Sequence, residues 1–259
     1  MNAAKIIDIR GRKLGGEAPL VCSPLVGRIR ERVLAEAATV IAKKPDVVEW
    51  RVDYFEGIAD TAAVLGTAKA LRAALGDTPI VFTRRSVKEG GEPIAIDDEA
   101  VVRLYDAVAA SRLVDFIDFE MGNDSDHLRR VRDSTRAHEV RLILSYHNFA
   151  YTPGIETLVQ RFLEAERLGA DVAKVAVMPR DRMDVLTLLA ATARADAKGS
   201  IPLISMAMGP LGSVTRMIGG VFGSSLSFAV GEAASAPGQI PIADLHTVYD
   251  IIRRARGAR

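Results

Sequence analysis

Short apolar runs that alternate with segments of helical period constrain the fold of this chain more than any other feature. The apolar runs occupy 19–23, 46–52, 79–84, 114–119, 140–146, 171–177, 201–206 and 224–230. Segments of helical period occupy 28–43, 60–75, 97–111, 124–138, 155–169 and 182–196. Strands that alternate with helices in this way form parallel sheets joined by crossover helices, so the pattern predicts an α/β fold.

The spacing favours a closed (β/α)8 TIM barrel, and a doubly wound open sheet is the alternative. Eight strand–helix units in 259 residues average about 32 residues each, which is the size of a βαβ step. Barrels of this length commonly fold as one unit. No linker rich in Pro and Gly divides the chain, so we expect a single domain over 1–259, with residues 1–18 as a cap over one end of the barrel.

Composition and charge exclude several classes of function. The net charge is +1 and no basic stripe is present, so we expect no nucleic-acid partner. No apolar run is long enough to span a membrane, and the N-terminus has no apolar segment typical of a signal peptide. The single cysteine, Cys22, allows no intramolecular disulfide and fits a buried position. These features predict a cytoplasmic protein.

Charged side chains occur in strands that would be plain aliphatic runs in an ordinary parallel sheet. Residues two apart in a strand share a face, and four strands place polar groups on one face near their C-terminal ends. These groups are Glu49, Arg51 and Asp53, then Asp118 and Glu120, then Ser145 and His147, and finally Lys174. A buried ion network is one interpretation. Because active sites of barrels lie at the C-terminal ends of the strands, a catalytic site is the other.

Lys174 is the most informative of these residues. It is flanked by Val172, Ala173, Val175 and Ala176, and apolar surroundings disfavour the charged form of an amine. A neutral amine can attack a ketone and form an imine. The alternatives are a lysine at the strand end that reaches out to water, or one that pairs with Glu120 or Asp118.

His147 and Arg216 suggest proton transfer and anion binding. His147 follows the strand at 140–146, and a histidine can take and return a proton near neutral pH. Arg216 lies in the Gly-rich stretch 206–223 and could hold a carboxylate or a phosphate, between which composition does not decide. No HExxH or CxxC motif occurs, so we expect no metal site.

Ordered motifs from the second strand onward closely resemble the type I 3-dehydroquinate dehydratases of the shikimate pathway. The motifs are EWRVDYF at 49–55, FTRRSVKEGGE at 82–92, IDFE at 117–120, SYHNF at 145–149, KVAVMP at 174–179, MAMGPLGSVTR at 206–216, VFGSSLSF at 221–228 and SAPGQIP at 235–241. Each motif alone is weak, but their order and spacing are specific. The first strand matches loosely, and many relatives have Lys-Glu where this chain has Pro210 and Leu211.

The resemblance implies a reaction and its catalytic residues. It implies dehydration of 3-dehydroquinate to 3-dehydroshikimate through an imine on Lys174. His147 would act as general base and acid, and Glu89 would orient it or tune its pKa. The imine would replace a metal or cofactor as the electron sink, so no cofactor is expected.

The resemblance also implies the binding residues. Arg216 matches the carboxylate clamp, while Glu49 and Arg51 match residues that contact substrate hydroxyls. The remaining matches are Arg85 as a further binding arginine, Met206, Met208 and Phe228 as apolar lining, and Ser235 and Gln239 as contacts from a lid.

Two rival functions remain open at this stage. A class I aldolase-type barrel would also use a strand lysine and an imine, but it would cleave a carbon–carbon bond. A non-catalytic metabolite-binding barrel would hold Lys174 and His147 in a static polar network. Because small barrels often dimerise, we expect a homodimer.

Overall fold

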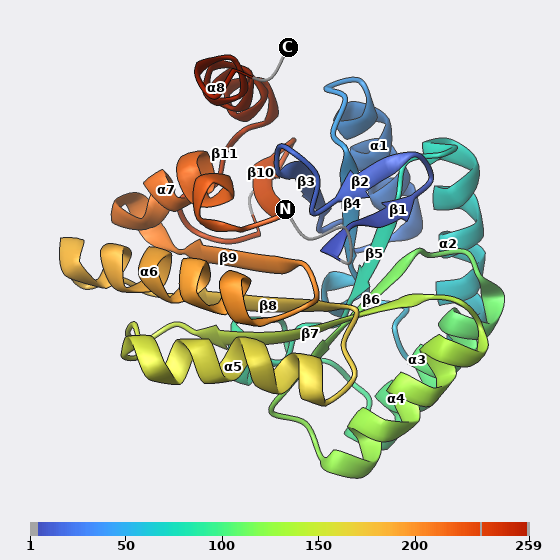
Figure 1. Cartoon of the computed structure of the whole chain (residues 1–259). Coiled ribbons are helices and arrows are strands. Elements are labelled where there is room, and N and C mark those ends of the chain that lie inside the picture. The colour runs from blue at the N-terminus through green and yellow to red at the C-terminus, as the bar shows by residue number, and fades with distance from the viewer. Residues whose placement is uncertain (1–4, 234, 258–259) are drawn as a thin grey trace.

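The computed structural model describes residues 5–233 and 235–257, and it confirms the α/β barrel (Figure 1). The barrel strands are β3 (Leu20–Leu25), β4 (Val47–Arg51), β5 (Ile80–Thr83), β6 (Phe116–Glu120), β7 (Arg141–Asn148), β8 (Val172–Val177), β9 (Leu203–Ala207) and β10 (Leu226–Val230). The helices are α1 (Arg30–Ile41), α2 (Thr61–Leu75), α3 (Asp98–Ser111), α4 (Ser125–Ala137), α5 (Ile155–Arg167), α6 (Arg182–Lys198), α7 (Gly209–Ile218) and α8 (Ile242–Ala255).

The strands form one parallel sheet that curls until its ends meet. Its order is β11-β10-β3-β4-β5-β6-β7-β8-β9, where β11 (Ile240–Pro241) is a short addition beside β10. A parallel bridge between Leu203 and Ser224 joins the β9 end to the β10 end. The amide of Ser225 also donates to the carbonyl of Leu203 at 2.7 Å. This contact closes the ring and excludes the open sheet.

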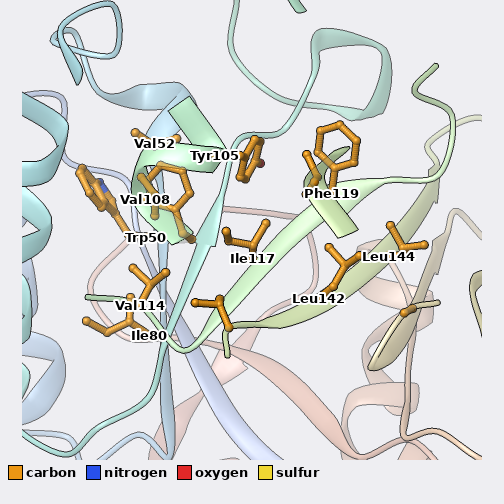
Figure 2. Close-up of a cluster of buried hydrophobic side chains, with 14 of the residues drawn as sticks. Trp50, Val52, Ile80, Tyr105, Val108, Val114, Ile117, Phe119, Leu142 and Leu144 are labelled. Carbon is orange, nitrogen blue, oxygen red and sulfur yellow. The ribbon is translucent and has the colours of Figure 1, made fainter. Parts of the chain in front are cut away.

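The layer between strands and helices is hydrophobic and rich in aromatic rings (Figure 2). Trp50, Phe82, Tyr105 and Phe119 form a chain of edge-to-face pairs with centroids 5.3–5.6 Å apart. Such pairs add about 0.5–1.5 kcal/mol each beyond the burial of their area. Because strand side chains alternate, an outward Trp50 leaves its neighbours Glu49 and Arg51 to face the barrel interior.

The barrel interior is apolar at one end and polar at the other. Its apolar end is filled by Val47, Val81, Phe116, Ile143, Val172, Ile204 and Leu226, near the N-terminal ends of the strands. A hairpin of β1 (Ile7–Ile9) and β2 (Arg12–Leu14) lies across that end, and its buried Leu14 packs into the same cluster. The polar groups are thereby confined to the C-terminal ends.

Local sequence explains how four of the helices start. Asp60, Asp97, Asp124 and Asp181 precede α2, α3, α4 and α6, and each carboxylate accepts a backbone N–H of the first turn. Among the described residues, none of the helices is both long and apolar enough to pass through a membrane.

Three local features differ from the sequence interpretation. The Gly-rich stretch 206–223, in which no helix was predicted, contains α7 and a 3-10 turn η4 (Gly219–Phe222). Pro210 favours the first turn of α7. Strand β7 continues through Asn148, so His147 belongs to the strand instead of following it. Strand β4 ends at Arg51, and Asp53 lies in a 3-10 turn η2 (Val52–Tyr54).

Candidate active site

Every side chain that the family resemblance implied lines one pocket at the C-terminal ends of the strands. The lining comprises Glu49, Arg51, Arg85, Glu89, Gly90, His147, Phe149, Lys174, Ala176, Met206, Met208, Arg216, Phe228, Ser235, Ala236 and Gln239. The residues come from most of the strands and from the loops that follow them, as expected for a barrel site.

Lys174 is buried on β8 between an acidic and an aromatic side chain. Its Nζ donates to Asp118 Oδ2 at 2.8 Å, and Glu49 Oε1 lies 3.9 Å away. The ring of Phe228 lies on another side, with its centroid 4.5 Å from Nζ. The expected apolar surroundings are therefore only part of the environment. Of the flanking residues, Ala173 and Val175 face the outer layer, whereas Val172 and Ala176 share the interior face with Lys174. The acidic groups that the amine meets come from the neighbouring strands.

Asp118 is a fully buried carboxylate. The family resemblance assigned it no role, but the strand pattern placed it on the polar face, and its pairing with Lys174 confirms one of the alternatives given for that lysine. Its Oδ1 accepts from Arg85 Nη2 and from Ser145 Oγ, both at 2.7 Å. Burial alone would raise the pKa of Asp118, but Arg85 and Lys174 outweigh it and hold that pKa well below its usual range. Asp118 is therefore an anion that faces the amine. The sequence signal was its position on the same strand face as Glu120.

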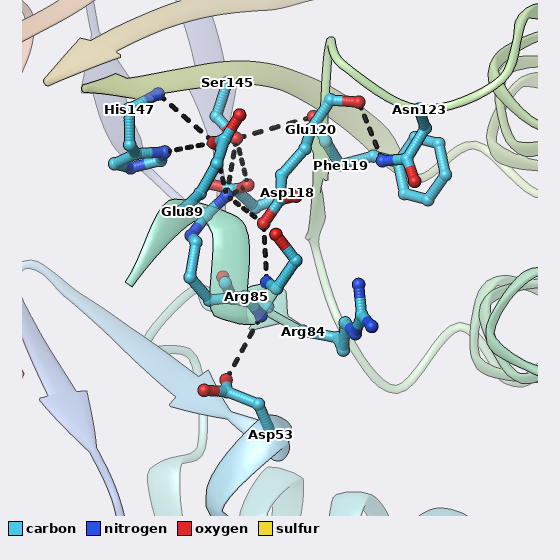
Figure 3. A network of polar contacts seen from close by, with 12 residues as sticks. Asp53, Arg84, Arg85, Glu89, Asp118, Phe119, Glu120, Asn123, Ser145 and His147 are labelled. Atoms are coloured by element: carbon cyan, nitrogen blue, oxygen red, sulfur yellow. Dashed lines mark hydrogen bonds and ion pairs between the residues drawn. The ribbon is translucent and has the colours of Figure 1, made fainter. Parts of the chain in front are cut away.

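Arg85 is the centre of an ionic cluster, which we define as Arg85, Lys174, Asp118, Glu120 and Glu89. Figure 3 shows Arg85 among Asp118, Glu120 and Glu89. Besides its bond to Asp118, Arg85 donates from Nη1 to Glu120 Oε1 at 3.2 Å. The Oε2 atom of Glu89 lies 3.7 Å from the same nitrogen. The guanidinium is thus surrounded by carboxylates before any ligand arrives.

Glu89 and His147 form a close pair at the edge of this cluster. Glu89 Oε2 lies 2.8 Å from Nδ1 of His147 and also accepts the backbone N–H of His147 at 3.1 Å. Two donors on one oxygen favour a proton on Nδ1, which leaves Nε2 as the basic nitrogen. Burial, Arg85 and Lys174 lower the pKa of His147 well below its usual value, so the ring is neutral.

The pKa of Glu89 moves in the opposite direction. Burial raises the pKa of Glu89 to about 8, with Glu120 and Asp118 adding to the rise and Arg85 opposing it. The charge of this carboxylate therefore changes within the pH range in which an enzyme is normally assayed.

Glu49 and Arg51 reach the pocket from β4. Glu49 accepts a hydrogen bond from Thr83 Oγ1 at 2.8 Å. Arg51 makes a bidentate pair with Asp53, at 2.8 Å from Nε and 2.7 Å from Nη2. Both side chains are therefore held in one orientation, which is what recognition of ring hydroxyls requires.

Arg216 is buried on α7 without a carboxylate partner among the described residues. Its Nη1 donates to the carbonyl of Phe228 at 3.2 Å, its Nη2 donates to the carbonyl of Pro237 at 3.3 Å, and its Nε has no hydrogen-bond partner. Burial lowers the pKa of Arg216 to about 10. A buried cation of this kind is stabilised by an anion, so this end of the pocket suits a carboxylate or a phosphate.

The loop after β10 covers the Arg216 end. The carbonyl of Pro237 accepts from Gly209 N at 3.2 Å as well as from Arg216. Within the loop, Gln239 Oε1 accepts from Ser235 N at 3.1 Å and Gln239 Nε2 donates to Ser235 Oγ at 3.3 Å. The predicted lid contacts thus face the pocket from a segment that touches α7.

A larger cavity, of about 350 Å³, lies at the opposite end of the barrel. Its lining includes Lys5, Asp196, Arg256, the segment 15–19, and the residues Gly220, Val221, Gly223, Ser224 and Ser225. Lys5 is already paired with Asp196 at 2.9 Å. The cavity therefore lacks the buried reactive groups of the smaller pocket, which remains the candidate site. Across the described residues, no group of three or more His, Cys, Asp or Glu side chains is arranged to hold a metal ion.

A family model and individual known proteins both match this chain, and they indicate the same family. Residues 21–256 match the family model described as type I 3-dehydroquinase. A 3-dehydroquinate dehydratase from Albidiferax ferrireducens is 55% identical over 258 residues, which cover 99% of this chain and 98% of that protein.

Two solved structures of the same family superpose closely on this chain. A 3-dehydroquinate dehydratase from Geobacillus kaustophilus HTA426 is 47% identical, with a TM-score of 0.95 and coverage of 96% of this chain and 97% of that one. A type I 3-dehydroquinate dehydratase from Clostridium difficile, solved with covalently modified comenic acid, is 34% identical, with a TM-score of 0.93 and coverage of 97% and 99%.

Proposed function

The chain belongs to the type I 3-dehydroquinase family, and from this premise we propose that it dehydrates 3-dehydroquinate to 3-dehydroshikimate through an imine on Lys174. The observation that carries the proposal is the buried Lys174 amine, 2.8 Å from the ionised Asp118, in a pocket that the neutral His147 also lines. This arrangement supports an amine nucleophile and a separate base in one site.

In the first step Lys174 attacks the ketone of the substrate. It attacks as the neutral amine after one proton has left its nitrogen, and that proton is returned to the oxygen that departs. The ammonium and the ketone together therefore yield a protonated imine and one molecule of water. The ammonium and the iminium carry the same single positive charge, so Asp118 stabilises the state before the step and the state after it. Because the pKa of Asp118 is held low, this residue acts as a counter-ion and not as the store for a proton.

In the second step His147 removes a proton from the carbon beside the imine. The electron pair of the broken C–H bond moves into the iminium, which gives a neutral enamine. The enamine then expels the hydroxyl group, and the imidazolium of His147 returns its proton to form water. Hydrolysis of the new iminium consumes one water and releases the enone product and Lys174. The net change is the loss of one water from the substrate.

Arg216 would bind the carboxylate of the substrate. It is a buried arginine without an acidic partner among the described residues, and it lines the pocket beside Met206 and Phe228. Glu49 and Arg51 would contact the ring hydroxyls, and Arg85 would support this side of the pocket through the ionic cluster. The loop with Ser235 and Gln239 would close over the bound ring and exclude water.

The iminium would serve as the electron sink, so we propose that no bound cofactor takes part. Homodimer formation and a cytoplasmic location stay predictions, and light scattering and cell fractionation test them.

One incubation distinguishes this proposal from its rivals. With 3-dehydroquinate, the enzyme should generate the ultraviolet absorbance of a conjugated enone, and borohydride added during turnover should inactivate it. An aldolase would show carbon–carbon cleavage products instead. A binding protein would show neither enone absorbance nor inactivation, and that result would remove the proposed function.

A further inference from the structure

Asp53 is a fully buried carboxylate whose oxygens are occupied by four donors. Its Oδ1 accepts from Arg51 Nε at 2.8 Å and from Arg85 N at 3.2 Å. Its Oδ2 accepts from Arg51 Nη2 at 2.7 Å and from Glu92 N at 3.2 Å. Asp53 does not line the pocket, so these contacts are not made for the substrate.

The two backbone donors mark the ends of one loop, residues 85–92, which carries Glu89. Its middle is a 3-10 turn η3 (Val87–Glu89), and it is drawn together by a bond from Gly91 N to the carbonyl of Ser86 at 2.8 Å. A Cβ on Gly91 would overlap the Arg85 carbonyl, so the two ends of the loop can approach this closely only with glycine at position 91. Asp53 therefore fastens both ends of the segment that brings Glu89 to His147.

A second contact holds the loop from the pocket side. Gly90 follows Glu89 with a φ of +83°, and the ring of Phe149 lies against it, in the place where a side chain would otherwise stand. Phe149 comes two residues after His147 on the same segment. Phe149 thus restricts the movement of the loop at Gly90, and the hydrogen bonds to the Asp53 carboxylate restrict it at both ends.

We propose that Asp53 is a positioning residue that couples two functions: it holds loop 85–92 so that Glu89 meets His147, and it holds Arg51 facing the substrate. This inference rests on the proposed function for the roles of Glu89 and His147. Asp53 touches neither the substrate nor the reacting atoms, so its influence on turnover would pass through Glu89, and its influence on binding through Arg51.

The substitution Asp53→Asn removes two of the four acceptor contacts with little change in shape. In either orientation the amide NH₂ group faces two donors, because each oxygen of Asp53 accepts one bond from Arg51 and one from the loop backbone. We expect kcat to fall about 10- to 100-fold, the usual cost of losing a group that orients a functional residue. KM should rise severalfold at the same time.

Asp115→Asn is the matched control. Asp115 accepts from Arg10 Nε, Arg72 Nη2 and the backbone N–H of Ile80, so it has similar chemistry at the opposite end of the barrel. Its substitution should lower the melting temperature as much as Asp53→Asn does but should leave kcat and KM unchanged. Equal losses of kcat in both variants would reduce Asp53 to a general structural role.

A double-mutant cycle with Glu89→Gln tests the path of the effect. If Asp53 acts through Glu89, the fall in kcat caused by Asp53→Asn should vanish in the Glu89→Gln background, while the rise in KM should persist. The same fold-loss of kcat in both backgrounds would overturn the proposal. Asp53→Glu keeps the charge but displaces the oxygens, so it should show the same pattern and serves if Asp53→Asn does not fold.

The outcome is separable from a failure of the proposed function. The cycle is read from turnover, whereas the imine is read from trapping by borohydride. A wild-type enzyme that dehydrates the substrate without being trapped would contradict the imine and leave the cycle to be decided on kcat. A trapped wild-type enzyme with an unchanged kcat in Asp53→Asn would contradict only the positioning role.

Discussion

Arg85 and Arg216 are both almost fully buried beside the same pocket, yet their surroundings differ. Arg85 stands among Asp118, Glu120 and Glu89, and its positive charge is balanced within the protein. Arg216 contacts two backbone carbonyls and a methionine sulfur, and no described carboxylate pairs with it. One arginine is therefore neutralised by neighbouring carboxylates, and the other is bonded only to neutral groups of the described residues.

Under the proposed function, this difference would separate the part of the site that reacts from the part that binds. The ionic cluster needs no ligand to be stable, so it fixes Lys174 and Glu89 before the substrate enters. Arg216 gains a counter-charge only when an anion arrives, so its interaction contributes to binding. A substrate with a ketone at one end and a carboxylate at the other fits this division.

Removal of the Lys174 amine would test whether the ionic cluster and the Arg216 end of the pocket act independently. Lys174→Ala should abolish the reaction, with a loss in kcat of about 10⁴-fold or more, as for other covalent nucleophiles. Arg216 is untouched, so the dissociation constant for 3-dehydroquinate, measured by calorimetry, should stay within about tenfold. If binding disappeared together with turnover, the two parts of the pocket would not be independent.

Removal of the base should separate two steps within the reactive part. His147→Ala should lower kcat by about 10²- to 10⁴-fold, the range for general acid–base catalysis. Lys174 and Asp118 remain in place, so borohydride should still trap an imine, and the trapped fraction should rise because elimination has become slow. Near-normal turnover in this variant would show that another group transfers the proton.

Equivalent substitutions of the two arginines should affect stability unequally. Arg85→Met leaves Asp118 and Glu120 buried without their partner, which typically costs about 3–5 kcal/mol. Arg216→Met removes a charge that has no acidic partner within 5–233 and 235–257, so the free energy of unfolding should change by less than about 1 kcal/mol or increase. Urea denaturation of both variants measures the difference, and equal destabilisation would contradict the comparison.

The pH dependence should distinguish stability from activity at Glu89. Its folded pKa of about 8 lies above the ordinary value of about 4.3, so the folded state holds the proton more tightly. The contribution of Glu89 to stability is complete below the ordinary value and is lost as the pH rises through about 8. Activity should rise over the upper part of this window, because the carboxylate fixes the proton of His147 on Nδ1.

The measurement for this prediction is a pH profile of kcat beside a pH series of unfolding free energies. Glu89→Gln should lose the limb of the kcat profile near pH 8 and flatten the matching part of the stability series. A limb that persists in Glu89→Gln would assign the titration to another group.

Much of the fold could be predicted because the strands of this barrel have a local sequence pattern. Each strand is a short apolar run, and aspartates such as Asp60 and Asp97 mark helix starts in the sequence. Helix α7 could not be recognised in the same way, because glycines at 209 and 212 weaken the helical pattern. Gly212 is required there by close packing against the backbone of Ala207, which is a tertiary fact.

The sequence could predict which residue types lie in the site, but it could not predict which of them contact one another. The resemblance indicated Lys174 and His147, and the structure places both on the pocket. The resemblance did not indicate Asp118 as a site residue, and the strand pattern gave it only as an alternative partner of the amine beside Glu120. The choice between the two crosses from β6 to β8 and depends on the register of the strands between them. The sequence showed Asp53 as a charged residue close to Arg51. Its hydrogen bonds to the two ends of loop 85–92 could be found only in the folded structure.

The central claim is that the amine of Lys174 forms the covalent intermediate, and peptide mapping tests it most directly. The protein is incubated with 3-dehydroquinate, reduced with borohydride, digested and analysed by mass spectrometry. We predict a mass increase confined to the peptide that contains Lys174, and none without substrate. Modification of another lysine, such as Lys88 on the neighbouring loop, or no modification of an active enzyme, would contradict the account.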